Sequence, residues 1–279
     1  WSENINLALD IAPKLDCGVV WINSTNQFDA ACGFGGNRES GYGREGGHEG
    51  MMEVLKPKFL SRLPSYKETK APTPADYKTG ATLADLDRTP KLYIGGKQAR
   101  PDSGYSLPVF SAKGEKIGEV GEGNRKDIRN AVEAARKATG WTKASSHNRA
   151  QVLYYLAENL DIRKSEFADR LKLMSGVSAK KAQAEVDATI QRLFSYGAWT
   201  DKYESAVHSP PMRGVTLAMK EPIGTMGIVC PDDNPLLSMV SLAAPALAMG
   251  NRIVLIASER HPLTATDFYQ VLETSDMPA

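Results

Sequence analysis

Two adjacent carboxylates draw attention first, because they follow an apolar run that is typical of a buried strand. Asp232 and Asp233 lie in Cys-Pro-Asp-Asp-Asn-Pro-Leu at 230–236, directly after Met-Gly-Ile-Val at 226–229. Such a pair could act as a general acid and base, or could bind a metal ion. It could also mark a site from which a former chemistry has been lost. The metal alternative needs further oxygen ligands, which the neighbouring sequence does not supply.

The cysteines and histidines give no second candidate for a metal site. Cys17, Cys32 and Cys230 are three in number and lack metal-like spacing, a pattern that favours reduced thiols in a cytoplasmic protein. The four histidines lie far apart in polar or loop-like surroundings. We therefore expect no metal site and expect surface positions for the histidines.

The composition narrows the class of protein. Of 279 residues, 42% are apolar and 24% are charged, and the net charge is +1. These values are ordinary for a soluble globular chain and lack the basic excess of a nucleic-acid-binding protein. No apolar run approaches the length of a membrane span. The chain begins with Trp1 in a helical pattern, so we expect it to be a fragment of a longer polypeptide.

A glycine-rich stretch at 34–47 is the second feature that could carry chemistry. Its glycines could cradle a phosphate group, or could simply permit a tight loop. The stretch lacks the GxxxxGK[ST] pattern. It therefore predicts an irregular loop in which several of Gly35, Gly36, Gly41 and Gly43 have positive φ, rather than a phosphate site.

The remaining pattern predicts elements that would position these residues. Residues 1–15 have helical spacing that ends or bends at Pro13, and the apolar run at 19–23 suits a buried strand. Residues 56–90 have the composition of a linker. The later predicted elements are listed in chain order: strand–turn 91–98, strands 107–110 and 116–120, helix 125–138 with an Asn124 cap, one or two helices at 148–174, helix 178–204 with Val186, Ile190, Leu193 and Phe194 on one face, strand 226–230, helix 235–249, strand 252–256, and a helix starting near Pro262. The last strand–helix–strand run predicts a parallel crossover and an α/β fold.

The glycine-rich stretch closely resembles the C-terminal end of the aldehyde dehydrogenase superfamily. In that family a helix and a strand ending in Asn lead to a Pro-Phe-Gly-Gly…Ser-Gly-x-Gly-Arg-Glu signature. The present sequence matches it at Asn23 and along 34–45, with Gly33 in place of the proline. The resemblance covers about residues 1–55 and implies that Phe34 lines the substrate tunnel.

Residues 91–279 resemble the beginning of the same family. Leu-Tyr-Ile-Gly-Gly-Lys-Gln at 92–98 is similar to its opening strands, and 221–279 is similar to its Rossmann-like βαβ cofactor-binding unit. The chain thus resembles a tandem family 16 aldehyde dehydrogenase, whose second module is degenerate. This implies three parts: 1–55 as the end of one module, 56–90 as a linker, and 91–279 as the N-terminal, cofactor-domain part of a second module.

The resemblance also interprets the two carboxylates. The family has Pro-Trp-Asn-x-Pro here, and its Asn donates a hydrogen bond to the developing oxyanion. An alignment without gaps puts Asp232 at the Trp and Asp233 at the Asn. An ionised carboxylate cannot donate that bond, and the loss of one oxyanion donor costs about 3 kcal/mol of barrier. This favours lost chemistry over an acid/base pair.

A second departure concerns the cofactor. The family's Lys-Pro-Ser-Glu, which contacts the adenosine ribose, is here Ile256-Ala257-Ser258-Glu259. The resemblance therefore implies weak or absent NAD(P) binding, with residual contacts from Pro231, Ser258 and Glu259. Glu259 could equally serve only as a cap of the following turn.

Three functions follow as expectations. The first is a segment of an NAD(P)-dependent aldehyde dehydrogenase, inactive alone, whose intact parent oxidises a small aldehyde. The second is a non-catalytic module that packs against another aldehyde dehydrogenase module or forms a homo-oligomer. The third is a free-standing nucleotide-binding module. We expect no nucleic-acid or membrane partner.

Overall fold

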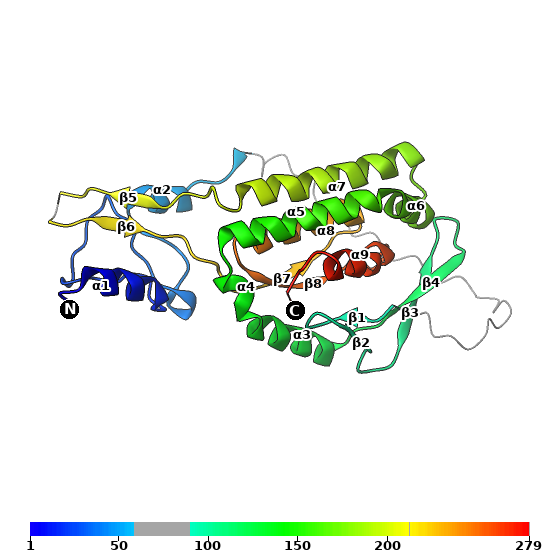
Figure 1. Cartoon of the computed structure of the whole chain (residues 1–279), viewed down its shortest axis with the longest axis horizontal. Helices are drawn as coiled ribbons and strands as arrows, with labels where there is room; N and C mark the ends of the chain where they lie inside the picture. The colour runs from blue at the N-terminus through cyan, green and yellow to red at the C-terminus, as the bar shows by residue number, and fades with distance from the viewer. Residues whose placement is uncertain (59–89, 212, 279) are drawn as a thin grey trace. The chain divides into compact units, whose positions relative to one another are not determined.

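The chain forms two compact units in a computed structural model that describes residues 1–58, 90–211 and 213–278 (Figure 1). The first unit contains the described residues up to 58 together with the segment 204–220. The second contains the described residues from 90 to 203 and from 221 to 278. Most of the predicted linker, 59–89, lies outside the described residues.

The first unit is built from short elements. They are listed in chain order: α1 (Ile5–Ile11), the 3₁₀ turns η1 (Ala12–Lys14) and η2 (Arg38–Ser40), α2 (Gly47–Glu53), and the strands β5 (Ala206–His208) and β6 (Thr216–Ala218). The Asn4 side chain caps α1 by accepting a hydrogen bond from Leu7 N at 3.1 Å. The helix ends at Ile11, before Pro13, as the sequence predicts. The strands β5 and β6 pair as an antiparallel hairpin, with Val207 opposite Leu217.

The strand predicted at 19–23 is wrong. These residues have no regular secondary structure, and they are half-buried or exposed. Asn23 has a left-handed backbone, with φ of 53°, which a β-strand cannot contain. Its side chain instead holds the chain start, because it accepts from Ser2 N at 2.8 Å and donates to Ser2 O at 2.7 Å. Among the described residues, the run at 19–23 pairs with no strand.

The glycine-rich loop at 34–47 is irregular, as predicted, but its glycines are required for a different reason. Of the four glycines expected to have positive φ, Gly41 alone does, with φ of 115°. Gly35 and Gly36 are required because backbones approach closely, whereas Gly46 and Gly47 at the end of the loop have φ of 71° and 59°. A Cβ on Gly18 would lie 1.8 Å from Gly35 O, and a Cβ on Gly35 would lie 2.4 Å from Gly43 O. Steric space rather than dihedral freedom therefore selects glycine at these positions.

The second unit is α/β, and its helices cover small sheets. Its elements are listed in chain order: β1 (Leu92–Tyr93), β2 (Gln98–Ala99), β3 (Ser106–Phe110), β4 (Lys116–Gly121), α3 (Arg125–Lys137), α4 (Thr139–Lys143), α5 (Ser146–Ile162), α6 (Lys164–Ser175), α7 (Ala179–Trp199), β7 (Thr225–Val229), α8 (Pro235–Ala248), β8 (Arg252–Ile256) and α9 (Leu263–Glu273). The stretch at 148–174 is thus two helices separated at Arg163. Asn124 and Asp127 form the capping box that begins α3.

The part of this unit that bears on function is the pair β7 and β8. The two strands are parallel, with Val229 opposite Ile256, and α8 connects them. Helices α5, α7 and α8 lie together beside the pair (Figure 1). Their apolar faces form a core that includes Leu153, Val186 and Leu236, each fully buried. This packing fixes the carboxyl ends of both strands.

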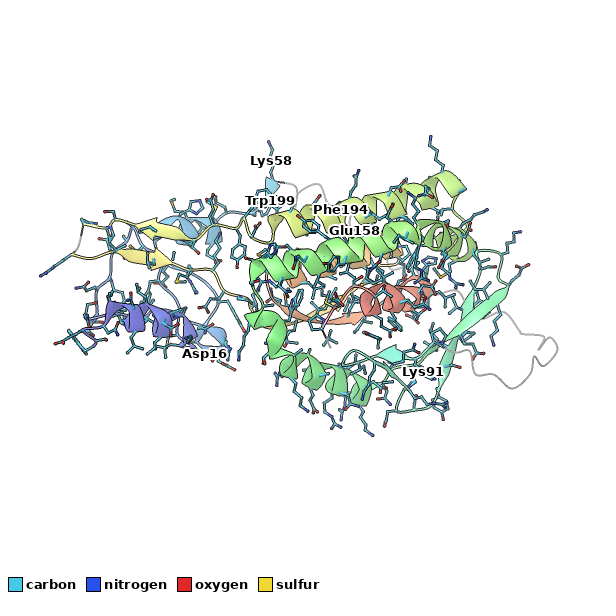
Figure 2. The ribbon with its side chains drawn as sticks, in the orientation of Figure 1. Asp16, Lys58, Lys91, Glu158, Phe194 and Trp199 are labelled. Carbon is cyan, nitrogen blue, oxygen red and sulfur yellow. The ribbon has the colours of Figure 1, made fainter. Side chains whose placement is uncertain are left out.

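The predicted apolar face of α7 is confirmed in part. Val186, Ile190 and Leu193 are buried, whereas Phe194 is 39% exposed and is visible beside the helix in Figure 2. The Phe194 ring lies at the margin of the face, with its centroid 6.0 Å from that of Tyr154. Within the part of the chain that the structure describes, no helix is long and apolar enough to cross a membrane.

Candidate functional site

The predicted site residues of the second unit lie at the carboxyl ends of β7 and β8. Asp232 and Asp233 follow β7, and Ser258 and Glu259 follow β8. Because the strands are parallel and in register, the loops after them meet at one edge of the sheet. This edge is where open α/β sheets bind ligands.

Asp232 and Ser258 are in direct contact across the two loops. The Ser258 hydroxyl donates a hydrogen bond to Asp232 Oδ1 at 2.7 Å. Ser258 is 3% exposed, whereas Asp232 is half-buried. The structure therefore brings together one of the two carboxylates and one of the residues to which the resemblance gives a cofactor contact.

Arg260 and His261 complete this cluster. Arg260 Nε lies 3.5 Å from Asp232 Oδ2 as an ion pair, and Arg260 N donates to Asp232 Oδ1 at 3.5 Å. The ring atom His261 Nδ1 lies 3.1 Å from Asp232 O, and His261 N donates to Ser258 Oγ at 3.0 Å. The polar groups of the two loops thus satisfy one another. The sequence analysis did not identify Arg260 or His261 as part of the site.

Asp233 is placed differently from its neighbour. Its side chain is exposed, while its backbone oxygen accepts a hydrogen bond from Ser238 Oγ at 2.7 Å. The next residue, Asn234, has φ of 46° and precedes the first turn of α8 without capping it through its side chain. Asp232 and Asp233 therefore do not share one environment, as a coupled acid/base pair would.

Glu185 on α7 supplies the cap that Asn234 does not. Its Oε1 accepts from Leu236 N at 3.0 Å and from Leu237 N at 3.3 Å. Burial raises the pKa of Glu185, although these two hydrogen bonds and the nearby His261 act to lower it. Glu185 was not among the site residues predicted from the sequence. A signal was present, because Glu185 falls on the same helical face as the buried Ala182 and Thr189.

The other predicted contacts at this edge are on the surface. Ile256, at the family's Lys position, is 47% exposed. Pro231 and Glu259 are also exposed. An isoleucine side chain offers no hydrogen bond to a ribose, so position 256 lacks the charged donor that the resemblance would require.

The thiols are not arranged as nucleophiles. Burial raises the pKa of the Cys230 thiol to about 11, so it is protonated at neutral pH. Cys32 is also buried, and Cys17 is exposed. Among the described residues, no group of three or more histidine, cysteine or acidic side chains could hold a metal ion.

In the first unit, Phe34 belongs to an aromatic cluster. Its ring centroid lies 4.9 Å from that of Phe28, which in turn lies 5.5 Å from Trp21, both in edge-to-face geometry. Backbone hydrogen bonds of 2.7 Å in both directions join Phe34 to Glu45. The ring remains 40% exposed. The signature loop thus closes on itself through this bridge and leaves Phe34 partly exposed.

The same unit contains a contact that the sequence analysis did not predict. His208 Nε2 on β5 lies 3.9 Å from Glu49 Oε1 on α2. The sequence-based division places residue 208 in the second module, whereas in the structure the segment 204–220 groups with the first segment. The hairpin therefore joins two parts of the sequence that the resemblance assigns to different modules.

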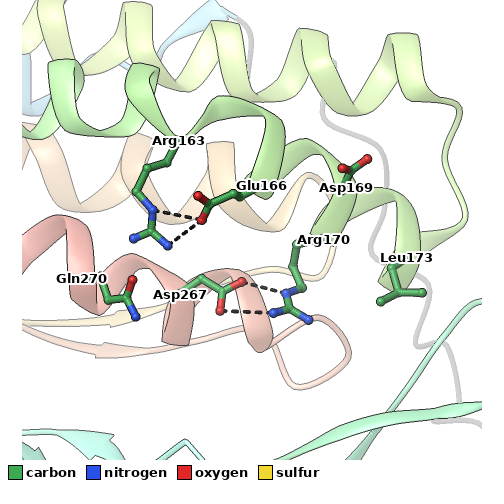
Figure 3. Close-up of a pocket in the computed structure, with 7 residues that line it drawn as sticks. All are labelled: Arg163, Glu166, Asp169, Arg170, Leu173, Asp267 and Gln270. Atoms are coloured by element: carbon green, nitrogen blue, oxygen red, sulfur yellow. Dashed lines mark hydrogen bonds and ion pairs between the residues drawn. The ribbon is translucent and has the colours of Figure 1, made fainter.

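A groove of about 460 Å³ lies between α6 and α9, and none of the predicted site residues is among those that line it (Figure 3). Its charged side chains are largely paired, with Arg170 Nε 2.7 Å from Asp267 Oδ2 and Arg163 2.7 Å from Glu166. The Arg170–Asp267 pair joins α6 to α9, and the Arg163–Glu166 pair lies at the start of α6. Because these charges are engaged with one another, the groove shows no set of groups converging on a ligand.

The chain is similar to aldehyde dehydrogenases in three comparisons. The model of the "Aldehyde dehydrogenase family" matches residues 1–60 and 101–279. Aldehyde dehydrogenase family 2 member B4, mitochondrial, of Arabidopsis thaliana is 36% identical over 63% of this chain and 34% of its own length. Aldehyde dehydrogenase, cytosolic 1, of Elephantulus edwardii is 30% identical over 67% and 39%. The chain thus spans well under half of these relatives.

Solved structures agree on the fold. Betaine aldehyde dehydrogenase from Staphylococcus aureus is 24% identical, has a TM-score of 0.66, and is matched over 68% of this chain and 39% of its own. A putative aldehyde dehydrogenase from Burkholderia cenocepacia is 26% identical with the same TM-score, over 68% and 39%. The predicted α/β fold with partial coverage of the relatives is therefore confirmed.

Proposed function

Since the chain belongs to the aldehyde dehydrogenase family, we propose that it is a segment of a tandem, family 16-like polypeptide that oxidises aldehydes to carboxylic acids. In this proposal 1–55 end one module, and 91–279 begin a second, degenerate module. The parent uses NAD(P), which when bound supplies the hydride acceptor. The chain by itself is inactive.

The proposed inactivity rests mainly on the carboxylate of Asp233. It is exposed at the end of β7, at the position that the resemblance assigns to the oxyanion donor. A carboxylate offers acceptors only. It also repels the negative charge that the donor would stabilise, and removal of one donor alone costs about 3 kcal/mol of barrier. The buried, protonated Cys230 does not supply the missing nucleophile.

The residues at the nucleotide edge do not fit NAD(P). Ile256 replaces a cationic donor, and the Ser258 hydroxyl is already bonded to Asp232. A lost charged hydrogen bond is worth about 1.5–3 kcal/mol, or roughly tenfold to a hundredfold in affinity. These features support weak or absent cofactor binding. Of the residual contacts Pro231, Ser258 and Glu259, the serine would have to give up its bond to Asp232 before its hydroxyl could donate to a nucleotide.

A second function, a non-catalytic packing or oligomerisation module, has one observation in its favour. The hairpin β5–β6 groups with the first segment, and His208 lies beside Glu49. In this view residues 91–279 hold the active module of the parent. The third function, a free-standing nucleotide-binding module, requires measurable NAD affinity.

The partners in this proposal are a small aldehyde and another aldehyde dehydrogenase module or a second copy. We place the protein in the cytoplasm, because the three cysteines are unpaired and several similar proteins carry the word cytosolic in their names. In the parent, Phe34 would contact the aldehyde, and its exposed ring is consistent with this role.

An assay of NADH formation with short aliphatic and aromatic aldehydes tests the proposal. The chain should give no turnover above the buffer background. Turnover that disappears when one of the three cysteines is replaced would show that the chain is an enzyme in its own right.

A further inference from the structure

The Ser258 hydroxyl, just after the carboxyl end of β8, both donates and accepts a hydrogen bond within the protein. A serine hydroxyl has one proton to donate, and Ser258 donates it to Asp232 Oδ1 at 2.7 Å. The same oxygen accepts from His261 N at 3.0 Å. Because the side chain is 3% exposed, it cannot turn to a second partner without breaking these bonds.

Asp232 also engages the next donors of the loop between β8 and α9. Arg260 N approaches Oδ1 at 3.5 Å, and Arg260 Nε approaches Oδ2 at 3.5 Å. Both carboxylate oxygens of Asp232 therefore contact groups of the loop after β8. These distances are at the limit of hydrogen bonding, whereas the bond to Ser258 is short. The attachment of Asp232 to Ser258 is thus the strongest of the set.

A nucleotide at this edge would need polar side chains that are free to bond. In open parallel sheets, nucleotides bind at the carboxyl ends of the strands, and in the dinucleotide-binding fold an acidic side chain bonds the ribose hydroxyl. Here the carboxylate is that of Asp232, on the neighbouring loop after β7. It accepts the hydrogen bond from Ser258 and is therefore not free for a ribose. Its negative charge, together with the exposed Asp233 and Glu259, also disfavours a phosphate group at this edge.

We propose that Asp232 is an intramolecular plug: its carboxylate occupies the one donor of the Ser258 hydroxyl, pairs with Arg260, and so closes a site for adenosine nucleotides at the carboxyl end of β8. This inference rests on the proposed function, because it takes this edge as the nucleotide side of the family fold. It differs from the replacement of the Lys by Ile256. There the donor is absent from the chain, whereas the Ser258 hydroxyl is present but already bonded to Asp232.

Titration of the full chain with AMP, followed by ligand-observed NMR and calorimetry, tests the plug. Asp232→Ala should bind AMP at least tenfold more tightly than the wild type does. If the wild type shows no binding, the variant should show a measurable Kd. The matched control is Asp233→Ala, which removes an equal charge from the adjacent exposed position and reports the gain from charge alone; this gain should be smaller than that of Asp232→Ala. Adding Ser258→Ala to Asp232→Ala should abolish the gain.

A second variant keeps the test decisive if Asp232→Ala does not fold by circular dichroism. Asp232→Asn removes the charge but keeps a hydrogen-bonding side chain, and it should bind AMP more tightly than Asp233→Asn. The plug is wrong if neither variant at 232 exceeds its control at 233. Micromolar NAD binding by the wild type would instead contradict the proposed weak cofactor binding. The plug is judged by the ratio between variants at 232 and at 233.

Discussion

Glu185 on α7 accepts a hydrogen bond from Leu236 N in the first turn of α8 at 3.0 Å. The contact joins residues 51 positions apart, and it holds the helix that follows Asp232 and Asp233 against the core. The side chain that fixes this loop is therefore a buried carboxylate on a distant helix, rather than a cap within the loop.

Replacement of Glu185 should separate its hydrogen bonding from its charge. Glu185→Leu leaves the N–H groups of Leu236 and Leu237 without their acceptor, and we expect the free energy of unfolding to fall by about 1–3 kcal/mol. Glu185→Gln keeps an acceptor and removes the buried charge. It should be at least as stable as the wild type at pH 8, as measured by urea denaturation.

The pH dependence follows from the direction of the pKa shift. Burial raises the pKa of Glu185 above its ordinary value of 4.5, so the folded state binds the proton more readily than the unfolded state. The charged side chain then costs stability above the raised pKa, and this cost is relieved as the pH falls through it toward 4.5. Any gain in the free energy of unfolding from Glu185→Gln should therefore shrink as the pH falls from the raised pKa toward 4.5. A Gln variant as unstable as the Leu variant at pH 8 would show that the charge itself is needed.

Arg149 should be a second determinant of stability. It is 5% exposed, and its Nε donates to Ala248 O at the end of α8 at 3.0 Å, while Nη1 donates to Ala144 O. Arg149→Met keeps the apolar stem but leaves these carbonyls unpaired, and we expect a loss of about 2–3 kcal/mol. The exposed Arg129→Met is the matched control and should change the midpoint of thermal unfolding little. Equal effects of both substitutions would contradict this account.

The cysteines should differ in reactivity. Burial raises the pKa of Cys230 to about 11, and only the thiolate reacts with alkylating reagents. Iodoacetamide at pH 8 should therefore modify the exposed Cys17 first and leave Cys230 unmodified in the folded chain, as peptide mass spectrometry would show. Labelling of Cys230 at a rate equal to that of Cys17 would mean that this strand end opens readily.

Phe34 should act on the aldehyde and not on the cofactor in the full-length parent. Its ring packs on Phe28 and is 40% exposed, so Phe34→Ala removes an apolar surface without deleting a polar contact. We expect a changed KM or selectivity for aldehydes, with NAD affinity nearly unaltered. Phe28→Ala, a substitution in the same aromatic cluster, is the comparison. Weakened NAD binding with normal aldehyde kinetics would remove Phe34 from the substrate side.

The sequence predicted the elements whose signals are local. Asn124 and Asp127 indicate the start of α3 through their capping pattern. The strands and helix from β7 through α8 to β8 are indicated by the hydrophobic pattern of their own residues. The β5–β6 hairpin was missed because each strand has three residues, too few for a period. The contact of His208 with Glu49 and that of Glu185 with Leu236 join distant segments, and such tertiary pairings leave no local pattern. The apolar run at 19–23 had the composition of a strand, but no strand in the described part of the chain pairs with it.

Calorimetric titration of the chain with NAD tests the central claim most directly, namely that this is an aldehyde dehydrogenase segment whose cofactor edge no longer works. Ile256 lacks a donor, and Asp232 holds the Ser258 hydroxyl. The account predicts no saturable heat at micromolar concentrations of NAD. A micromolar or tighter Kd would contradict it and would make a free-standing nucleotide-binding module the better description of the chain.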